Sequence, residues 1–357
     1  MTTNPAPTGP LAARLWDAVL AGDERTAVAA VRRALDDGAE PEGVLLDVIA
    51  RVQGRIGGHW AANRINVAQE HAATAINERT VGAVAGHPAA RTEPSRGRVV
   101  VACVDGEWHG LPARLVAEVL KLRGWQVDYL GAHVPTPHLV AHIHRTGPEV
   151  VALSSSIPTR LPTAHATITA CQAAGAPVLV GGAAFGPDGE YARLLGADAW
   201  APDARSAADL LERRPLPRPR ADHQPIDDLP HLADQEYTLV TRSRPQLVRA
   251  VLTALENRLP SMRGYDEAQR ERTAEDLAHI VDFLGAALYT GDPELLSRFL
   301  LWTTGILEAR GVPARSLPPA LDVLAGELKD FPRATDMLRS SLTRLPPAPL
   351  TVGGAAE

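Results

Sequence analysis

The feature that most constrains the fold is an alternation of short β-rich runs with helical segments between residues 98 and 213. Parallel strands joined by helices pack into a sheet that is covered on both faces. The pattern therefore predicts an α/β domain with a five-stranded parallel sheet. The expected strands are residues 98–104, 126–130, 149–154, 177–181 and 198–201, and the expected helices lie near 113–123, 137–145, 162–174, 188–195 and 204–213.

The segment before this domain, residues 10–88, has the apolar periodicity of helices. Asp23 can N-cap a helix that stops at Gly38, and Pro41 fits the first turn of the next helix. Asn66 is placed to cap a fourth helix. The sequence therefore predicts a four-helix bundle at the N-terminal side of the α/β domain.

The chain continues through a proline-rich linker into a second helical region. Residues 86–97 form a first polar linker, and residues 214–235 a second one that carries too many prolines for regular structure. Residues 236–345 are helical by periodicity. The main helices expected there are 246–259, 267–290 and 293–310, followed by two shorter ones.

The loop that follows the first β-rich run carries the clearest chemical motif. Asp105-Gly106-Glu107-Trp108-His109-Gly110 comes directly after that run, so it lies at the carboxyl end of the sheet, where α/β proteins bind ligands. It places an imidazole two residues from a carboxylate, an arrangement that orients metal-ligating histidines. The motif indicates a site for a large metallocofactor, although an ordinary loop histidine has the same local signature.

Composition narrows the class of protein. The length of 357 residues suggests two or three domains, and a net charge of −6 with interspersed signs predicts no nucleic-acid-binding face. No stretch has the features of a signal peptide or a membrane span. Cys103 and Cys171 fall in a predicted strand and a predicted helix, which favours buried thiols over a disulfide. We expect a cytoplasmic protein.

Five further motifs follow one another along the chain: Gln53–Trp60, Ile65–Thr74, Val151–Ser156, Pro177–Phe185 and Leu195–Asp198. Together with the E-x-H loop, they resemble cobalamin-binding modules, which combine a helical cap with a flavodoxin-like, doubly wound domain. The resemblance covers about residue 10 to residue 213. One departure lies in the loop, where Pro112 stands at the glycine of the usual E-x-H-x-x-G motif.

The resemblance implies roles for the residues at the strand ends. His109 would be the lower axial cobalt ligand in place of the cofactor's dimethylbenzimidazole, with Glu107 or Asp105 hydrogen-bonded to its far ring nitrogen. Trp108 and Gly110 of the same loop would contact the cofactor. The displaced nucleotide tail would occupy a slot lined by the small residues Ser154, Ser155, Ser156, Gly181 and Gly182.

The cap motifs point to the group on the upper side of the corrin. Trp60 and the pair Glu70-His71 fall on successive predicted helices, with Val67 nearby. This pattern resembles the light-sensing adenosylcobalamin repressors more than the cobalamin-dependent methyltransferases. Those repressors carry a histidine directly after the tryptophan, where this chain has Ala61. We therefore expect no light-formed bis-histidine adduct of that type unless His59 or another residue substitutes.

The C-terminal helices carry a second candidate site. Asp276, His279 and Phe283 fall on one face of a predicted helix, and Phe299 and Trp302 follow on the next. The region resembles the globin-like domain of photocobilins, which pair adenosylcobalamin with a bilin. That resemblance implies biliverdin, bound without a thioether because both cysteines lie elsewhere. A haem domain and a purely structural helical domain are the alternatives.

The sequence as a whole thus predicts three domains: a cap (10–88), a cobalamin-binding domain (98–213) and a globin-like domain (236–345). The interpretation is a non-enzymatic photoreceptor of the photocobilin type, signalling through photolysis of the cobalt–carbon bond and domain rearrangement. A corrinoid methyl-transfer shuttle and a cobalamin-sensing interaction module are the alternatives. Expected partners are small-molecule chromophores and an effector protein, without membrane or direct nucleic-acid contact. Self-association is left open.

Overall fold

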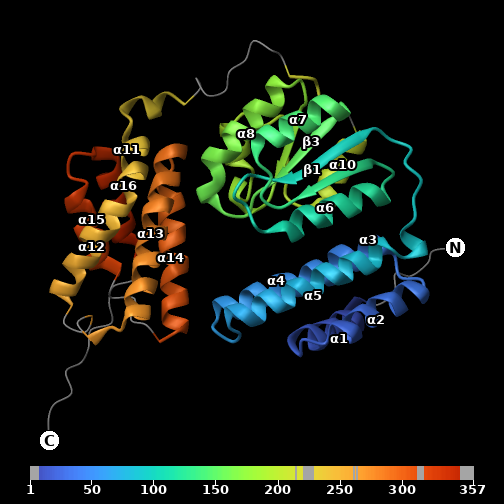
Figure 1. Ribbon diagram of the computed structural model, residues 1–357, viewed down its shortest axis with the longest axis horizontal. Coiled ribbons are helices and arrows are strands. Elements are labelled where there is room, and N and C mark those ends of the chain that lie inside the picture. The colour runs from blue at the N-terminus through green and yellow to red at the C-terminus, as the bar shows by residue number, and fades with distance from the viewer. Residues whose placement is uncertain are drawn as a thin grey trace, which may run out of the picture. The chain divides into compact units, whose positions relative to one another are not determined.

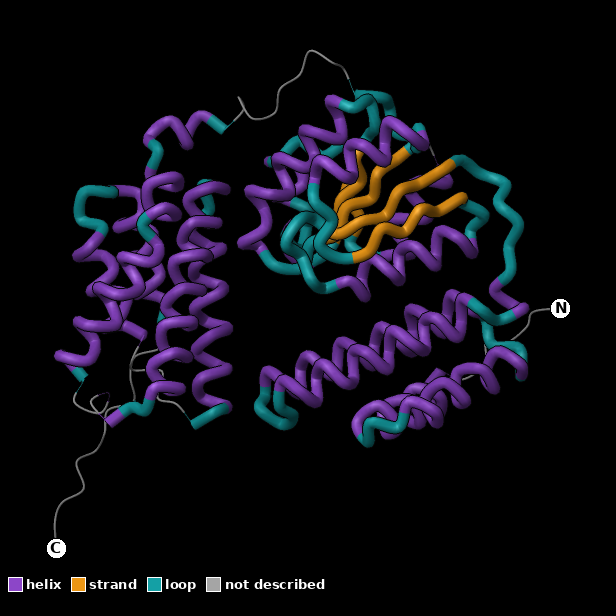
Figure 2. Tube along the Cα trace, in the orientation of Figure 1, coloured by secondary structure: helices purple, strands orange, loops and turns teal. Residues whose placement is uncertain are grey.

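The computed structural model describes residues 8–213, 215–219, 229–259, 262, 264–311 and 317–345. The chain folds into two compact units, Met1–Asp228 and Leu229–Glu357. The first combines helices with a sheet, and the second is helical (Figures 1 and 2). No helix within the described ranges is both long enough and apolar enough to cross a membrane.

The first unit begins with a helical bundle, here called the cap (Figure 1, blue). Side-chain caps start two of its helices as predicted: Asp23 accepts the Thr26 N–H at 3.0 Å, and Asn66 forms a capping box with Gln69. Its elements are α1 (Thr8–Leu20), α2 (Glu24–Asp36), α3 (Pro41–Gly43), the π-helical η1 (Val44–Ile49), α4 (Ala50–Ala61) and α5 (Val67–Ala85). Because α3, η1 and α4 follow one another without a break, they count as one continuous helix. Together with α1, α2 and α5 they make the predicted four-helix bundle.

The sheet of the first unit is parallel throughout, with strand order β2-β1-β3-β4-β5. This order confirms the predicted doubly wound fold, and it places the topological switch point between β1 and β3. Each strand lies within one residue of its predicted bounds: β1 (Arg98–Cys103), β2 (Gln126–Gly131), β3 (Val150–Ser154), β4 (Val178–Gly181) and β5 (Ala199–Ala201).

Helices cover both faces of the sheet. On the face towards the cap, α6 (Gly110–Leu122) packs against α10 (Ala204–Arg213), while α7 (Thr136–Thr146) packs against α8 (Leu161–Ala173) on the other (Figure 1). The short α9 (Glu190–Leu194) follows β4. The described part of the unit also contains the short 3-10 helices η2 (Pro88–Ala90), η3 (Pro158–Arg160) and η4 (Ala183–Phe185).

The start of α6 differs from the prediction. The helix begins at Gly110, three residues before the expected start, and His109 is its N-cap residue. Pro112 therefore falls in the first turn, where a proline removes no helical hydrogen bond. The departure from the glycine motif thus leaves the helix intact and places His109 directly at its N-terminus.

The cap and the sheet share one hydrophobic core and an ion network. Buried side chains of α1, η1, β1 and α6 belong to the same core cluster. At its edge, the Arg123 guanidinium on α6 contacts Glu42 of the cap at 2.7 Å, and Arg205 on α10 contacts Glu42 at 3.0 Å and Asp47 at 3.2 Å. Arg123 holds the pKa of Glu42 below its usual range. These contacts attach one end of the cap to the sheet domain.

The described residues of the second unit form an all-α fold, as predicted. Its elements are η6 (Pro230–Asp234), α11 (Glu236–Arg242), α12 (Arg244–Arg258), α13 (Glu267–Thr290), α14 (Pro293–Ala309), α15 (Leu317–Glu327) and α16 (Pro332–Arg344). The turn η6 and helix α11 were not predicted. Glu236, which is buried, accepts the backbone N–H groups of Arg333 and Ala334 and so caps α16. The likeness of this unit to a globin stays a prediction. Of the expected linker 214–235, residues 214 and 220–228 lie outside the described residues, and Pro230–Asp234 forms η6.

Both cysteines are free and buried, as predicted. Burial raises the pKa of Cys103 and of Cys171 to about 12, so both side chains stay protonated at neutral pH. A protonated, buried thiol is a poor nucleophile and a poor metal ligand.

We predict that Arg123→Ala lowers the free energy of unfolding by about 1–2 kcal/mol, because it removes a partly buried guanidinium from Glu42. Urea unfolding at pH 7 measures the loss. Arg51→Ala is the matched control: Arg51 is 71% exposed and lies 3.5 Å from Asp47, so its loss should stay below about 0.5 kcal/mol. Equal losses in the two variants would contradict a special role for the Arg123 network.

Candidate functional site

The candidate site lies where two loops meet at the carboxyl edge of the sheet. The loop after β1 (104–109) and the loop after β3 (155–160) flank the switch point between these strands. The Val104 N–H donates to the Ser154 carbonyl at 3.1 Å, which joins the bases of the two loops. This is the position where open α/β sheets bind ligands.

Glu107 connects the two loops from within. Its side chain is 1% exposed, and its Oε2 accepts the Ser156 N–H at 2.6 Å, the Ile157 N–H at 3.2 Å and the Ser155 hydroxyl at 3.2 Å. Burial acts to raise the pKa of Glu107, but the hydrogen bonds from His109 and Ser156 outweigh it and hold the pKa at about 2. Glu107 is therefore a permanently ionised acceptor.

His109 is oriented by that carboxylate. Its Nδ1 lies 2.6 Å from Oε1 of Glu107, which also accepts the His109 backbone N–H at 2.9 Å. The side chain is 56% exposed, and within the part of the chain that the structure describes Nε2 of His109 has no hydrogen-bond partner. A histidine fixed at one nitrogen and open at the other has the geometry of a metal ligand.

The charges around His109 favour its protonated form. The hydrogen bond to Glu107 raises the pKa of His109, burial opposes this, and the negative charges of Glu107 and of Glu70 on α5 raise the pKa further. Glu70 belongs to the cap, so the cap places a carboxylate within electrostatic reach of the loop histidine.

Asp105 and Trp108 face a residue that the sequence analysis missed, His133 in the loop after β2. Nδ1 of His133 accepts the Gly106 N–H at 2.9 Å and lies 3.5 Å from Asp105. The Trp108 indole stacks on the His133 ring, with 4.5 Å between centroids. Of the two carboxylates considered for His109, only Glu107 therefore contacts it. The position of His133 just after a predicted strand end was the available signal.

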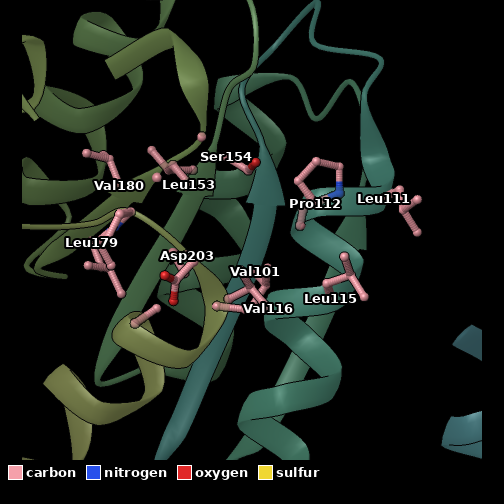
Figure 3. Close-up of a pocket in the computed structure, with 18 of the residues that line it drawn as sticks. Val101, Leu111, Pro112, Leu115, Val116, Leu153, Ser154, Leu179, Val180 and Asp203 are labelled. Atoms are coloured by element: carbon pink, nitrogen blue, oxygen red, sulfur yellow. The ribbon is translucent and has the colours of Figure 1, made fainter. Parts of the chain in front are cut away.

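A cavity of about 300 Å³ lies between the sheet, α6, α10 and the cap (Figure 3). Ser154, Gly181 and Gly182 line it, together with apolar side chains such as Leu115, Val116 and Leu179. Gly110 comes directly before the lining residue Leu111, and its carbonyl accepts the Tyr129 hydroxyl at 3.2 Å.

Ser155 and Ser156, which were also expected in the slot for the nucleotide tail, are not among the residues that line this cavity. Ser155 is fully buried, and both residues donate to Glu107. Gly182 passes so close to Ser155 that an added Cβ would lie 2.2 Å from the Ser155 carbonyl oxygen, and its φ of 98° also favours glycine. The glycine thus permits the close approach of the loops after β3 and β4.

The cap contributes a wall of the cavity that the sequence analysis also missed. Leu46 from η1 and Ala50 and Gln53 from α4 line it. Their spacing of four and three residues places them on one helix face. The same spacing marks any core-facing helix, so it did not distinguish cavity residues from core residues.

The predicted upper-face residues lie on successive helices, Trp60 on α4 and Val67, Glu70 and His71 on α5. Trp60 is half-buried and packs against the core, whereas Val67 is 57% exposed. Nδ1 of His71 lies 2.7 Å from Oε2 of Glu70.

His59, the suggested substitute for a histidine at Ala61, packs edge-on against Trp16 of α1, with 4.7 Å between ring centroids. This contact holds its ring within the bundle. The structure therefore does not favour His59 as an upper-face ligand.

In the second unit, the predicted residues gather on the paired helices α13 and α14. The rings of Phe283 and Phe299 stack with 3.7 Å between centroids, and Trp302 lies 6.3 Å from Phe299. Asp276 and His279 are exposed on α13, and Trp302 is 51% exposed. Partial desolvation raises the pKa of Asp276, against the opposing charges of His279 and Arg310. The α13–α14 face thus combines aromatic rings with a carboxylate and an imidazole.

Known protein families match both parts of the first unit, the sheet domain and the cap. A B12 binding domain model matches residues 97–211, and a second B12 binding domain model matches residues 11–84, which form the cap. The HTH-type transcriptional repressor CarA of Myxococcus xanthus is 32% identical over 177 residues, covering 47% of this chain and 57% of the repressor. The chain thus spans little more than half the length of this curated relative.

A solved structure, the monomethylamine corrinoid protein of Methanosarcina barkeri, matches with a TM-score of 0.51 at 19% identity, over 58% of this chain and 100% of that protein. At this identity the likeness shows the fold alone. Together with the domain matches, it shows that the first unit carries cobalamin-binding domains, which imply a corrinoid cofactor.

The residues of the site fit such a cofactor. Nε2 of His109 would hold the cobalt of such a cofactor, and Glu107 would keep the imidazole ring oriented. The cavity beside α6 has small and apolar walls, which suit the heterocyclic base of a nucleotide tail.

We predict that cobalamin affinity falls as the pH decreases through the raised pKa of His109, because only the neutral imidazole binds cobalt. The fall should approach about tenfold per pH unit below that pKa, since one proton is displaced. The fall in affinity should begin above pH 6.5, which is the usual pKa of histidine. Equilibrium titration in the dark between pH 5 and 9 measures it.

Two variants test the assignment. Glu107→Gln removes the main cause of the raised pKa, so the midpoint of the fall should move to lower pH. His109→Ala should bind more weakly, with a corrin spectrum that lacks the histidine ligand, and without this pH dependence. A wild-type affinity that is flat from pH 5 to 9 would count against His109 as the ligand.

Proposed function

We propose that this chain is a light sensor that binds adenosylcobalamin in its first unit, with His109 as lower axial ligand, and biliverdin in its second. One observation carries the proposal: the carboxylate-oriented His109 lies at the sheet edge, within electrostatic reach of Glu70 from the cap. The site therefore has a nitrogen for the metal on one side and a polar cap residue on the other.

On the lower side, the chain holds and orients the cofactor. Glu107 fixes the ring of His109 through Nδ1, so that Nε2 is the nitrogen available to cobalt. The cavity with Ser154, Gly181 and Gly182 accepts the nucleotide tail. When bound, adenosylcobalamin supplies a visible-light-absorbing corrin and a cobalt–carbon bond that light breaks.

On the upper side, the cap selects the bulky adenosyl group. The Trp60 indole offers an apolar surface for a nucleoside, and Glu70 offers acceptor oxygens for ribose or adenine. The contact between Glu70 and His71 at 2.7 Å orients both side chains. This pattern resembles that of the light-sensing adenosylcobalamin repressors, and the match to a curated repressor supports a regulatory role.

The second unit is proposed to hold biliverdin without a covalent bond. Asp276 and His279 would bond to pyrrole N–H groups and propionates, while Phe283, Phe299 and Trp302 pack on the rings. Both cysteines of the chain lie in the first unit, so the second unit has no cysteine that could form a thioether. This assignment makes the chain a sensor of the photocobilin type.

The proposed output is domain rearrangement after loss of the adenosyl group. In this proposal the protein acts in the cytoplasm and binds an effector protein, rather than catalysing a reaction. The N-terminal cap and its contacts through Arg123 and Glu42 are the elements that would transmit the change. A methyl-transfer shuttle would use the same fold for a different purpose, and the next experiment separates the two.

We predict that the protein binds adenosylcobalamin more tightly than methylcobalamin in the dark, and that visible light changes its absorption spectrum and releases the adenosyl group. Trp60→Ala should lower the preference, because the indole surface is lost. Dark titration, followed by spectroscopy and chromatography after illumination, measures both effects. Protein loaded with hydroxocobalamin is the control and should not respond to light in this way.

Tighter binding of methylcobalamin, or methyl transfer with a corrinoid methyltransferase, would favour the shuttle instead. Adenosylcobalamin binding without any light-driven change in spectrum or hydrodynamic size would favour a cobalamin-sensing interaction module.

We predict that reconstitution with biliverdin produces red absorption that is lost on a denaturing gel, because no cysteine of the second unit is available for attachment. Asp276→Ala should reduce the red band, since a carboxylate partner of the pyrrole N–H groups is removed. Glu275→Ala is the matched control, with an exposed carboxylate one residue away on a different helix face. A Soret band on haem addition without a biliverdin band would overturn this assignment.

A further inference from the structure

A chain of hydrogen bonds runs through the cap and ends at Glu70. The Asn77 side-chain amide donates to Gln53 at 2.7 Å, and the Gln53 amide donates to the Thr74 hydroxyl at 2.7 Å. The Thr74 hydroxyl donates to Oε1 of Glu70 at 2.8 Å. The chain joins α4 to α5 and connects a fully buried amide to a carboxylate at the cofactor site.

The charge of Glu70 fixes the direction of this chain. An ionised carboxylate only accepts hydrogen bonds, so Thr74 must donate to it. The Thr74 oxygen then accepts from the Gln53 amide nitrogen, and the Gln53 oxygen accepts from Asn77. The direction leaves Oδ1 of Asn77 without a hydrogen-bond partner among the described residues.

This arrangement is costly for a helical bundle. Asn77 is 0% exposed, and a buried acceptor without a partner costs about 1–3 kcal/mol. The other buried side chains of α5 include Ala73, Ile76, Val81 and Val84, so an apolar residue at position 77 would suit the packing. The polar chain is therefore poorly explained by stability alone, and a functional requirement at its charged end is the better explanation.

The free oxygen positions of Glu70 show what that requirement is. Oε1 accepts from Thr74, and Oε2 contacts Nδ1 of His71 at 2.7 Å. A carboxylate has about four acceptor positions, so roughly one remains on each oxygen. Two neighbouring acceptors suit the two adjacent hydroxyl groups of a ribose, provided that the carboxylate is held in one orientation.

We propose that Thr74, Gln53 and Asn77 are positioning residues for Glu70, which set the preference of the site for a ribose-bearing upper group. This inference rests on the proposed function of the first unit. Gln53 also lines the cavity beside α6, so the chain links the upper side of the site to the proposed place of the nucleotide tail. None of the three residues is required to touch the ribose.

The test compares the affinities for adenosylcobalamin and hydroxocobalamin in the dark, since only the first carries a ribose on its upper side. Thr74→Val removes the donor to Glu70 with little change in volume. We expect the ratio of the two affinities to fall about tenfold, the effect of one hydrogen bond to a charged group, with hydroxocobalamin affinity unchanged. Thr74→Ser keeps the hydroxyl and should retain the wild-type ratio.

Two further variants distinguish the loss of this hydrogen-bond chain from general damage to the cap. Thr80→Val is the matched control, because Thr80 is buried on the same helix but donates only to the backbone carbonyl of Asn77 at 2.7 Å. It should leave the ratio unchanged. Gln53→Leu should lower the ratio, and combining it with Thr74→Val should add little, because both interrupt one chain.

The outcomes separate the two levels of the proposal. A wild-type preference for adenosylcobalamin that persists in Thr74→Val overturns the positioning role alone. Equal losses for both cobalamins in Thr74→Val also overturn it, because they indicate damage to the cap. A wild type without any preference for adenosylcobalamin overturns the proposed function itself, and the positioning role with it.

Discussion

The site depends on one buried carboxylate, Glu107. Its two oxygens accept hydrogen bonds from the loop after β1, through His109, and from the loop after β3, through Ser155, Ser156 and Ile157. A buried charge is tolerated only when such donors surround it. Because those donors come from both sides of the switch point, the same interaction closes the two loops together and orients the imidazole.

The sequence allowed the fold to be predicted where the signals are local. Strand bounds followed from short apolar runs, and the caps at Asp23 and Asn66 from single side chains. The E-x-H pair was visible because Glu107 and His109 are two residues apart. The contact of Glu107 with Ser156 spans 49 residues, and no local pattern indicates it. This is why the serines were predicted to line a slot when two of them serve the carboxylate.

The cap residues that line the cavity were missed for a different reason, because their spacing is that of any core-facing helix. Leu46 and Gln53 have the spacing of core positions, and the π-helical η1 that holds Leu46 contains no residue type that marks a change of helix. In the second unit, periodicity placed Phe283 on one face of its helix. It did not predict the stacking of that ring on Phe299, since the pairing of two helices depends on packing along their whole length.

The charges of the site also explain how one arrangement serves both the empty and the loaded protein. In the absence of cofactor, Glu107 and Glu70 raise the pKa of His109, so the imidazole favours a proton. In the proposed complex, the cobalt centre of the corrin would also be cationic and would use the same nitrogen. The two carboxylates that favour the proton therefore favour the metal that replaces it, and the exchange leaves the local charge nearly balanced. Glu107 can stay ionised in both states because its pKa of about 2 lies far below neutral pH. Glu70 has a second task in this scheme, because its side chain must also face the upper group. A carboxylate that serves both purposes has to be held in one orientation, which is the proposed role of the hydrogen bond from Thr74.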